Sequence, residues 1–222
     1  MELPFTPEQF FGIFEQYNET VWPAQVIIYI TAVVAFYLVL KPGNYSDKMI
    51  SGILAFFWLW MGIVYHWLFF ASVNPAARIF GAFFVLQGLI LVFEGIVRNK
   101  LIFSFSKGWH SAAGIVLMLF GPVIYPILGY FLGHTYPGSP TFGLPCPTTI
   151  FTIGALLLAS RPPRYVAVIP LLWAAIGFLA AVSLGVTEDT ALLVAGLIGT
   201  GGIMFRKKKA EQQTDTGVPE SI

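Results

Sequence analysis

Apolar residues in this chain occur in long uninterrupted runs, not at alternating positions. Without strict alternation of polar and apolar residues, the pattern predicts helices and excludes the strands of a membrane β-barrel. Most runs approach the roughly 20 residues that a helix needs to cross the hydrocarbon core of a bilayer. The runs are Trp22–Leu40, Met49–Ala71, Ala76–Val97, Ser111–Leu132, Thr148–Ser160, Tyr165–Leu184 and Glu188–Phe205.

Composition supports a membrane environment for these helices. The chain is 57% hydrophobic and only 10% charged, whereas a soluble domain carries about 25% charged residues. A soluble fold could not bury this much apolar surface, but lipid tails accept it. The predicted fold class is therefore all-α: a polytopic transmembrane bundle of seven spans over residues 22–205.

Residues 1–21 predict a short amphipathic helix before the first span. Thr6 can cap it, and Pro7 suits its first turn. Two placements are open: the helix lies on the membrane surface, or it packs over the end of the bundle. Its aromatic residues recur at helical spacing on one side, at Phe10, Phe11, Phe14 and Tyr17.

Lysine and arginine predict the orientation. They gather after the first, third, fifth and seventh runs, whereas Arg78 is the exception on the other side. Because basic loops stay in the cytoplasm, we expect the N-terminus outside, the C-terminus inside, and a multi-pass protein of the cell inner membrane. Residues 206–222 are expected to form a basic, then disordered, cytoplasmic tail. The basic residues are Lys41, Lys48, Arg98, Lys100, Lys107, Arg161, Arg164, Arg206, Lys207, Lys208 and Lys209.

The region around the fifth run is irregular. Gly121-Pro122 predicts a break in the fourth helix, and the proline-rich segment 133–147 predicts an ordered loop on the outer face. The run that begins at Thr148 is short, so its helix is expected to start within the outer leaflet with free N–H groups. Such broken helices form binding sites in many transporters.

The third run contains glycines at a spacing of seven, at Gly81, Gly88 and Gly95. Glycine lets a neighbouring helix approach closely, so we expect this span at the centre of the bundle, with Leu91 facing lipid. Gln87 is expected to bond another helix or a ligand. Glu94 either pairs with Arg98 four residues later or has a function, because a carboxylate within a membrane is costly.

Two histidines and the one cysteine fall on the predicted outer side. His66, His134 and Cys146 are residue types that bind zinc or copper, yet their spacing matches no metal motif, so they are weak metal candidates. The cofactor is left open. The residues hypothesised to bind a ligand are His66, His134, Cys146, Thr148, Gln87 and Glu94.

Two segments carry a resemblance to a known family. LPFTPEQFFGIFEQYNETVWPAQ and HTYPGSPTFGLPCPTTIFT resemble an uncharacterised bacterial family of polytopic membrane proteins, the domain of unknown function 6064. The resemblance implies a polytopic bacterial membrane protein. It implies no substrate and no catalytic residue.

Three function classes stay open. A small-solute or ion transporter with a site near the outer face ranks first, because of the broken helices. A non-enzymatic accessory or structural membrane subunit ranks second. An intramembrane metal-dependent enzyme ranks last, since no nucleophile, base and acid occur at useful spacing. The expected partners are the lipid bilayer and a second copy or another membrane protein, and the net charge of +1 gives no field that would attract nucleic acid.

Overall fold

The computed structural model describes residues 4–205, and this part of the chain is all-helical without strands. The basic tail expected at residues 206–222 lies outside the described residues. The α-helices are α1 (Pro7–Val21), α2 (Ala24–Leu40), α3 (Ser46–Trp60), α4 (Ala77–Leu91), α5 (Trp109–Leu119), α6 (Tyr125–Phe131), α7 (Pro145–Leu158), α8 (Val168–Leu184) and α9 (Thr190–Gly199). The π-helical segments are η1 (Met61–Phe69), η3 (Val92–Val97), η4 (Phe120–Ile124) and η7 (Thr200–Met204), and the 3-10 turns are η2 (Phe70–Ser72), η5 (Arg164–Ala167) and η6 (Thr187–Asp189).

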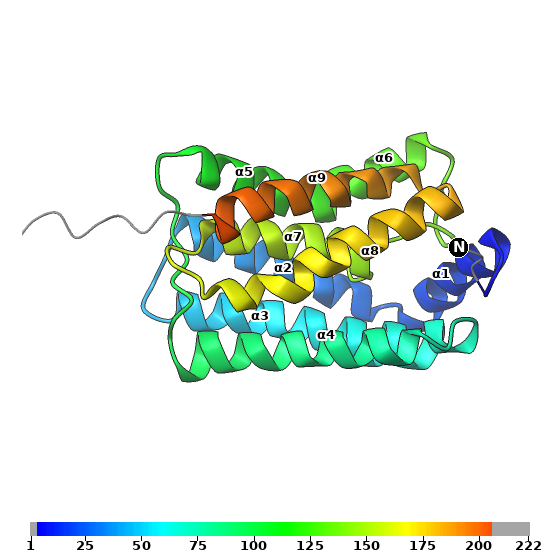
Figure 1. Ribbon diagram of the computed structural model, residues 1–222, viewed down its shortest axis with the longest axis horizontal. Helices are drawn as coiled ribbons and strands as arrows, with labels where there is room; N and C mark the ends of the chain where they lie inside the picture. The colour runs from blue at the N-terminus through cyan, green and yellow to red at the C-terminus, as the bar shows by residue number, and fades with distance from the viewer. Residues whose placement is uncertain (1–3, 206–222) are drawn as a thin grey trace, which may run out of the picture.

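The helices from α2 to α9 run along the long axis of the molecule, and the chain passes back and forth between its two ends (Figure 1). One end, here called the basic end, holds segments 41–45, 98–108 and 159–163. The other end, here called the cavity end, holds α1 and segments 72–76, 132–144 and 185–189 (Figure 1). The sequence assigned a set of basic residues to cytoplasmic loops. Those within the described residues all lie at the basic end or in the first turn of a helix that starts there.

Four helical stretches are long and apolar enough to cross a membrane: Ser46–Ser72, Ala77–Val97, Trp109–Phe131 and Arg164–Leu184. The pair α1 and α2 makes a fifth if it is taken as one span bent by 88°. α7 is apolar but shorter. The described part of the chain thus has four to five candidate spans, which is consistent with a membrane protein.

The structure confirms the capped first helix and places it against the bundle. The Thr6 hydroxyl accepts a hydrogen bond from the Gln9 amide, and the Gln9 side chain accepts one from the Thr6 amide. This reciprocal capping box satisfies two free donors of the first turn. The buried Tyr17 ring packs edge-on against Tyr65 and Phe69. α1 therefore packs over the end of the bundle.

The expectation that the third span is central is wrong. Its glycine face does pack closely on α3, because a Cβ on Gly88 would lie 2.7 Å from Leu59 Cγ and 3.2 Å from the Ala55 carbonyl oxygen. The opposite face of α4 is exposed, however, and Leu91 is fully buried while Leu89 is exposed. The central helix is α7, which is buried on almost all sides. Glycine spacing identified the packing face of α4 but not how many neighbours the helix has.

The irregular region is ordered, as expected. The fourth span continues through Gly121-Pro122 as the π-helical segment η4, so the break is local. Gly121 is required there, since a Cβ would lie 2.4 Å from the Pro147 carbonyl oxygen. The loop before α7 folds inward, and its Phe142 ring is fully buried against Phe57 and Phe151.

Candidate functional site

A cavity of about 640 Å³ lies at the cavity end, between α1, α4, α7 and α8. Its wall on α8 includes Ile176 and Leu179, which are 42% and 66% exposed. Phe80 of α4 also lines the cavity. Aromatic side chains form much of the remaining wall: Phe5, Phe10, Phe14, Tyr65, Phe70 and Trp173.

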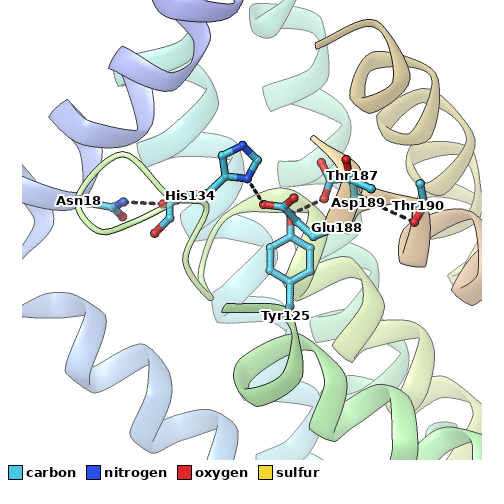
Figure 2. A network of polar contacts seen from close by, with 8 residues as sticks. Asn18, Tyr125, His134, Thr187, Glu188, Asp189 and Thr190 are labelled. Carbon is cyan, nitrogen blue, oxygen red and sulfur yellow. Dashed lines mark hydrogen bonds and ion pairs between the residues drawn. The ribbon is translucent and has the colours of Figure 1, made fainter. Parts of the chain in front are cut away.

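Two adjacent carboxylates lie at the inner side of this cavity, in η6. Asp189 lines the cavity and is 5% exposed. The buried Tyr125 hydroxyl donates a hydrogen bond to the Asp189 carboxylate (Figure 2). The Cys146 thiol and the Trp173 indole also interact here, and both approach Gly177: a Cβ on that glycine would lie 3.6 Å from Sγ and 3.5 Å from Nε1.

Glu188 pairs with His134 of the outer loop. Its Oε1 lies 2.7 Å from His134 Nδ1, and Figure 2 shows the imidazole above the carboxylate. The Glu188 side chain is fully buried and that of His134 is 20% exposed. The second oxygen of Glu188, Oε2, has no hydrogen-bond partner. The His134 ring also contacts Phe11, with ring centroids 4.8 Å apart, so this pair ties α1, the loop and η6 together.

The sequence places the two carboxylates at a helix start. Gly185 ends α8 in the left-handed conformation (φ 74°), which glycine adopts without strain. The chain then turns through η6, and the Thr190 hydroxyl donates to the Thr187 carbonyl oxygen over 2.8 Å. Asp189 immediately precedes α9, where the helix dipole favours a negative charge.

Asn18 of α1 holds the outer loop in place. Its Nδ2 donates to the carbonyl oxygens of Pro137 and Ser139, at 2.6 and 2.8 Å. Its Oδ1 accepts from Gln25 Nε2 at 2.6 Å and from the Thr141 hydroxyl at 2.8 Å. All four bonds of a buried amide are thus used, and the loop is fixed above the cavity.

Three of the sequence-predicted residues gather near the cavity. Cys146 lines it, and His134 reaches its carboxylates through Glu188. His66 is fully buried behind it, with its ring 5.3 Å from that of Trp173 and its Nδ1 2.8 Å from the Met61 carbonyl oxygen. His66 Nε2 has no hydrogen-bond partner.

The other three predicted residues have separate surroundings. The Thr148 hydroxyl accepts from the Gly143 amide at 3.0 Å, so it shapes the loop. Gln87 donates to the Val166 carbonyl oxygen at 2.8 Å. Of its two expected roles, a bond to another helix or to a ligand, the structure shows the first. Glu94 pairs with Arg98 at 3.0 Å at the basic end.

The described residues contain no group of three or more histidine, cysteine, aspartate or glutamate side chains that could hold a metal ion. Sequence reasoning missed the carboxylates at the site, together with Tyr125 and Asn18. One signal was available, because Glu188 and Asp189 are adjacent charges at the start of an apolar run, where burial of at least one is expected.

Comparison with known proteins gives one result. A model described as a family of unknown function, DUF6064, matches residues 7–214. No match to a curated protein or to a solved structure was found. The match covers α1, the outer loop, η6 and the cavity-lining residues from Phe10 onward.

Proposed function

This chain belongs to the family of unknown function DUF6064, and from that premise we propose that it is a multi-pass inner-membrane protein that binds a small solute at its cavity end and transports it. The observation that carries the proposal is the cavity of about 640 Å³ with a buried carboxylate in its wall. Its volume falls in the range of small-molecule sites, roughly 300–1,000 Å³.

The proposed topology has seven spans, with the cavity end outside. α7 and the loop above it together form the fifth span, and α2 and α9 with η7 form the first and last. The separation of charge along the bundle supports this orientation, because basic residues gather at the opposite end. The lipid bilayer is then the main partner, and the exposed faces of the long helices contact it.

An accessory role has less support. The small residues of α8 and α9 could have formed a contact with another subunit, but they pack inside the chain. A Cβ on Gly177 would meet Leu192 at 2.7 Å, one on Gly196 would meet Ala174 at 2.9 Å, and one on Gly199 would meet Ile153 at 2.7 Å. These faces are therefore already occupied.

The proposal is tested by filling the cavity. Ala180 lines it, so Ala180→Trp should displace a bound molecule, whereas Leu197→Trp on the exposed side of α9 is the matched control. The proteins would be extracted directly into lipid nanodiscs, and their bound small molecules compared by mass spectrometry. A molecule held by the wild type and the control, but not by Ala180→Trp, would then be loaded into proteoliposomes. Its flux should require the wild-type cavity; binding without flux would overturn transport.

A further inference from the structure

The cavity wall has one formal charge among the described residues that line it, and this charge is negative. It belongs to Asp189, which is only 5% exposed. No lysine, arginine or histidine lines the cavity. A ligand anion would therefore meet a carboxylate and no basic residue in this wall.

The Asp189 carboxylate can accept a further hydrogen bond. A carboxylate accepts up to about four hydrogen bonds, and the structure gives this one the Tyr125 hydroxyl, with the Cys146 side chain nearby. An ammonium group offers three donors and a charge of the complementary sign, and charge-assisted hydrogen bonds are among the strongest. A neutral apolar occupant would instead leave the carboxylate desolvated and under-bonded.

The aromatic wall also favours a cation with an apolar body. Trp173, Tyr65 and Phe14 line the same cavity as Asp189. Aromatic ring faces attract organic cations within about 6 Å, most strongly when water is excluded. Their large apolar surfaces would bury a hydrocarbon chain or ring beside the amino group.

We propose that the cavity is a binding site for a small organic amine, whose protonated amino group is held by Asp189 and whose apolar body packs against Trp173 and the rings of α1 and η1. This inference rests on the proposed function and names the ligand class of the same site. In this proposal the entrance lies beside α8, where Leu179 lines the cavity and is also exposed. An amphipathic amine dissolved in the outer part of the bilayer can therefore enter without crossing water.

The test uses three probes with one shape and three charges: phenylbutylamine, phenylbutanol and phenylbutyrate. Binding to the purified full chain in nanodiscs would be measured by calorimetry and by the shift in melting temperature. The amine should bind at least about tenfold more tightly than the alcohol, and the carboxylate should bind least. Asp189→Asn should remove the preference for the amine, and Glu19→Gln, which removes an exposed carboxylate from α1, should keep it.

Two results would overturn the inference: equal binding of the amine and the alcohol, or no binding of any probe. Comparing the probes on the wild-type protein needs no variant, so the test stands even if Asp189→Asn fails to fold. Ala180→Trp separates this inference from the proposed function. If all probes bind equally and Ala180→Trp abolishes their binding, the solute site remains and the amine class is wrong.

Discussion

The two ends of the bundle are held together by different kinds of bonds. At the basic end, connecting segments meet through their backbones: the Ser160 amide donates to the Ile102 carbonyl oxygen at 2.8 Å, and the Ser104 amide donates to that of Leu158 at 3.0 Å. At the cavity end, the long loop is held by side chains, above all by Asn18. Backbone bonds thus join the connecting segments at the basic end, whereas side-chain bonds hold the loop at the cavity end.

The acidic side chains at the two ends also differ in their partners. At the basic end, Glu94 has an arginine partner that is itself 41% exposed, so the pair reaches solvent. At the cavity end, the buried Glu188 pairs with His134, and the buried Asp189 accepts from Tyr125 and interacts with the Cys146 thiol. Burial of carboxylates without a full counter-charge is expensive, so their position beside a cavity favours a ligand-dependent role.

The largest expected effect is at Asn18. Asn18→Ala removes four hydrogen bonds: two loop carbonyl groups lose this donor, and Gln25 and Thr141 each lose one bond while keeping the bond between them. The free energy of unfolding should fall by about 3 kcal/mol, and the melting temperature by roughly 6–12 °C. Thermal unfolding in nanodiscs measures this, with exposed Gln16→Ala as the control. Equal melting temperatures for the two variants would mean that the loop does not depend on this side chain.

A smaller effect is expected at the basic end. The Asp47 carboxylate accepts a hydrogen bond from the Phe103 amide at 2.8 Å, and the backbone bonds between segments 102–104 and 158–160 remain without it. Asp47→Ala should therefore cost only about 1–2 kcal/mol, with Lys48→Ala as the control. Probe binding at the far cavity should be unchanged. A loss as large as that of Asn18→Ala would remove the contrast between the ends.

Sequence patterns predicted the structural features that depend on short segments of the chain. The helical secondary structure followed from the apolar runs, the Thr6 cap from its place before Pro7, and the Glu94–Arg98 pair from its four-residue interval. The close approach of α4 to α3 followed from the glycine spacing. Each of these needs only one helix or two helices in contact.

The site depended on contacts between distant segments, which no local pattern encodes. Tyr125 and Asp189 are 64 residues apart, and His134 and Glu188 are 54 apart. His134 and Cys146 could be suspected from their residue types alone. The position of Glu188 and Asp189 at the start of an apolar run could suggest that one of them is buried, but not that His134 and Tyr125 are their partners.

The last prediction concerns orientation and should leave stability unchanged. In a Cys146→Ser background, Tyr136→Cys places a thiol in the loop of the cavity end, and Phe105→Cys places one in a connection of the basic end. The two native side chains are each 54% exposed, so the new thiols should react equally fast in purified protein.

In cells with the outer membrane made permeable, an impermeant maleimide should label Tyr136→Cys at once. It should label Phe105→Cys only after the inner membrane is opened. This follows because basic segments are retained in the cytoplasm. The reverse pattern would place the cavity on the cytoplasmic side. Labelling of both thiols in intact inner membranes would mean that the helices from α2 to α9 do not cross the bilayer as seven spans.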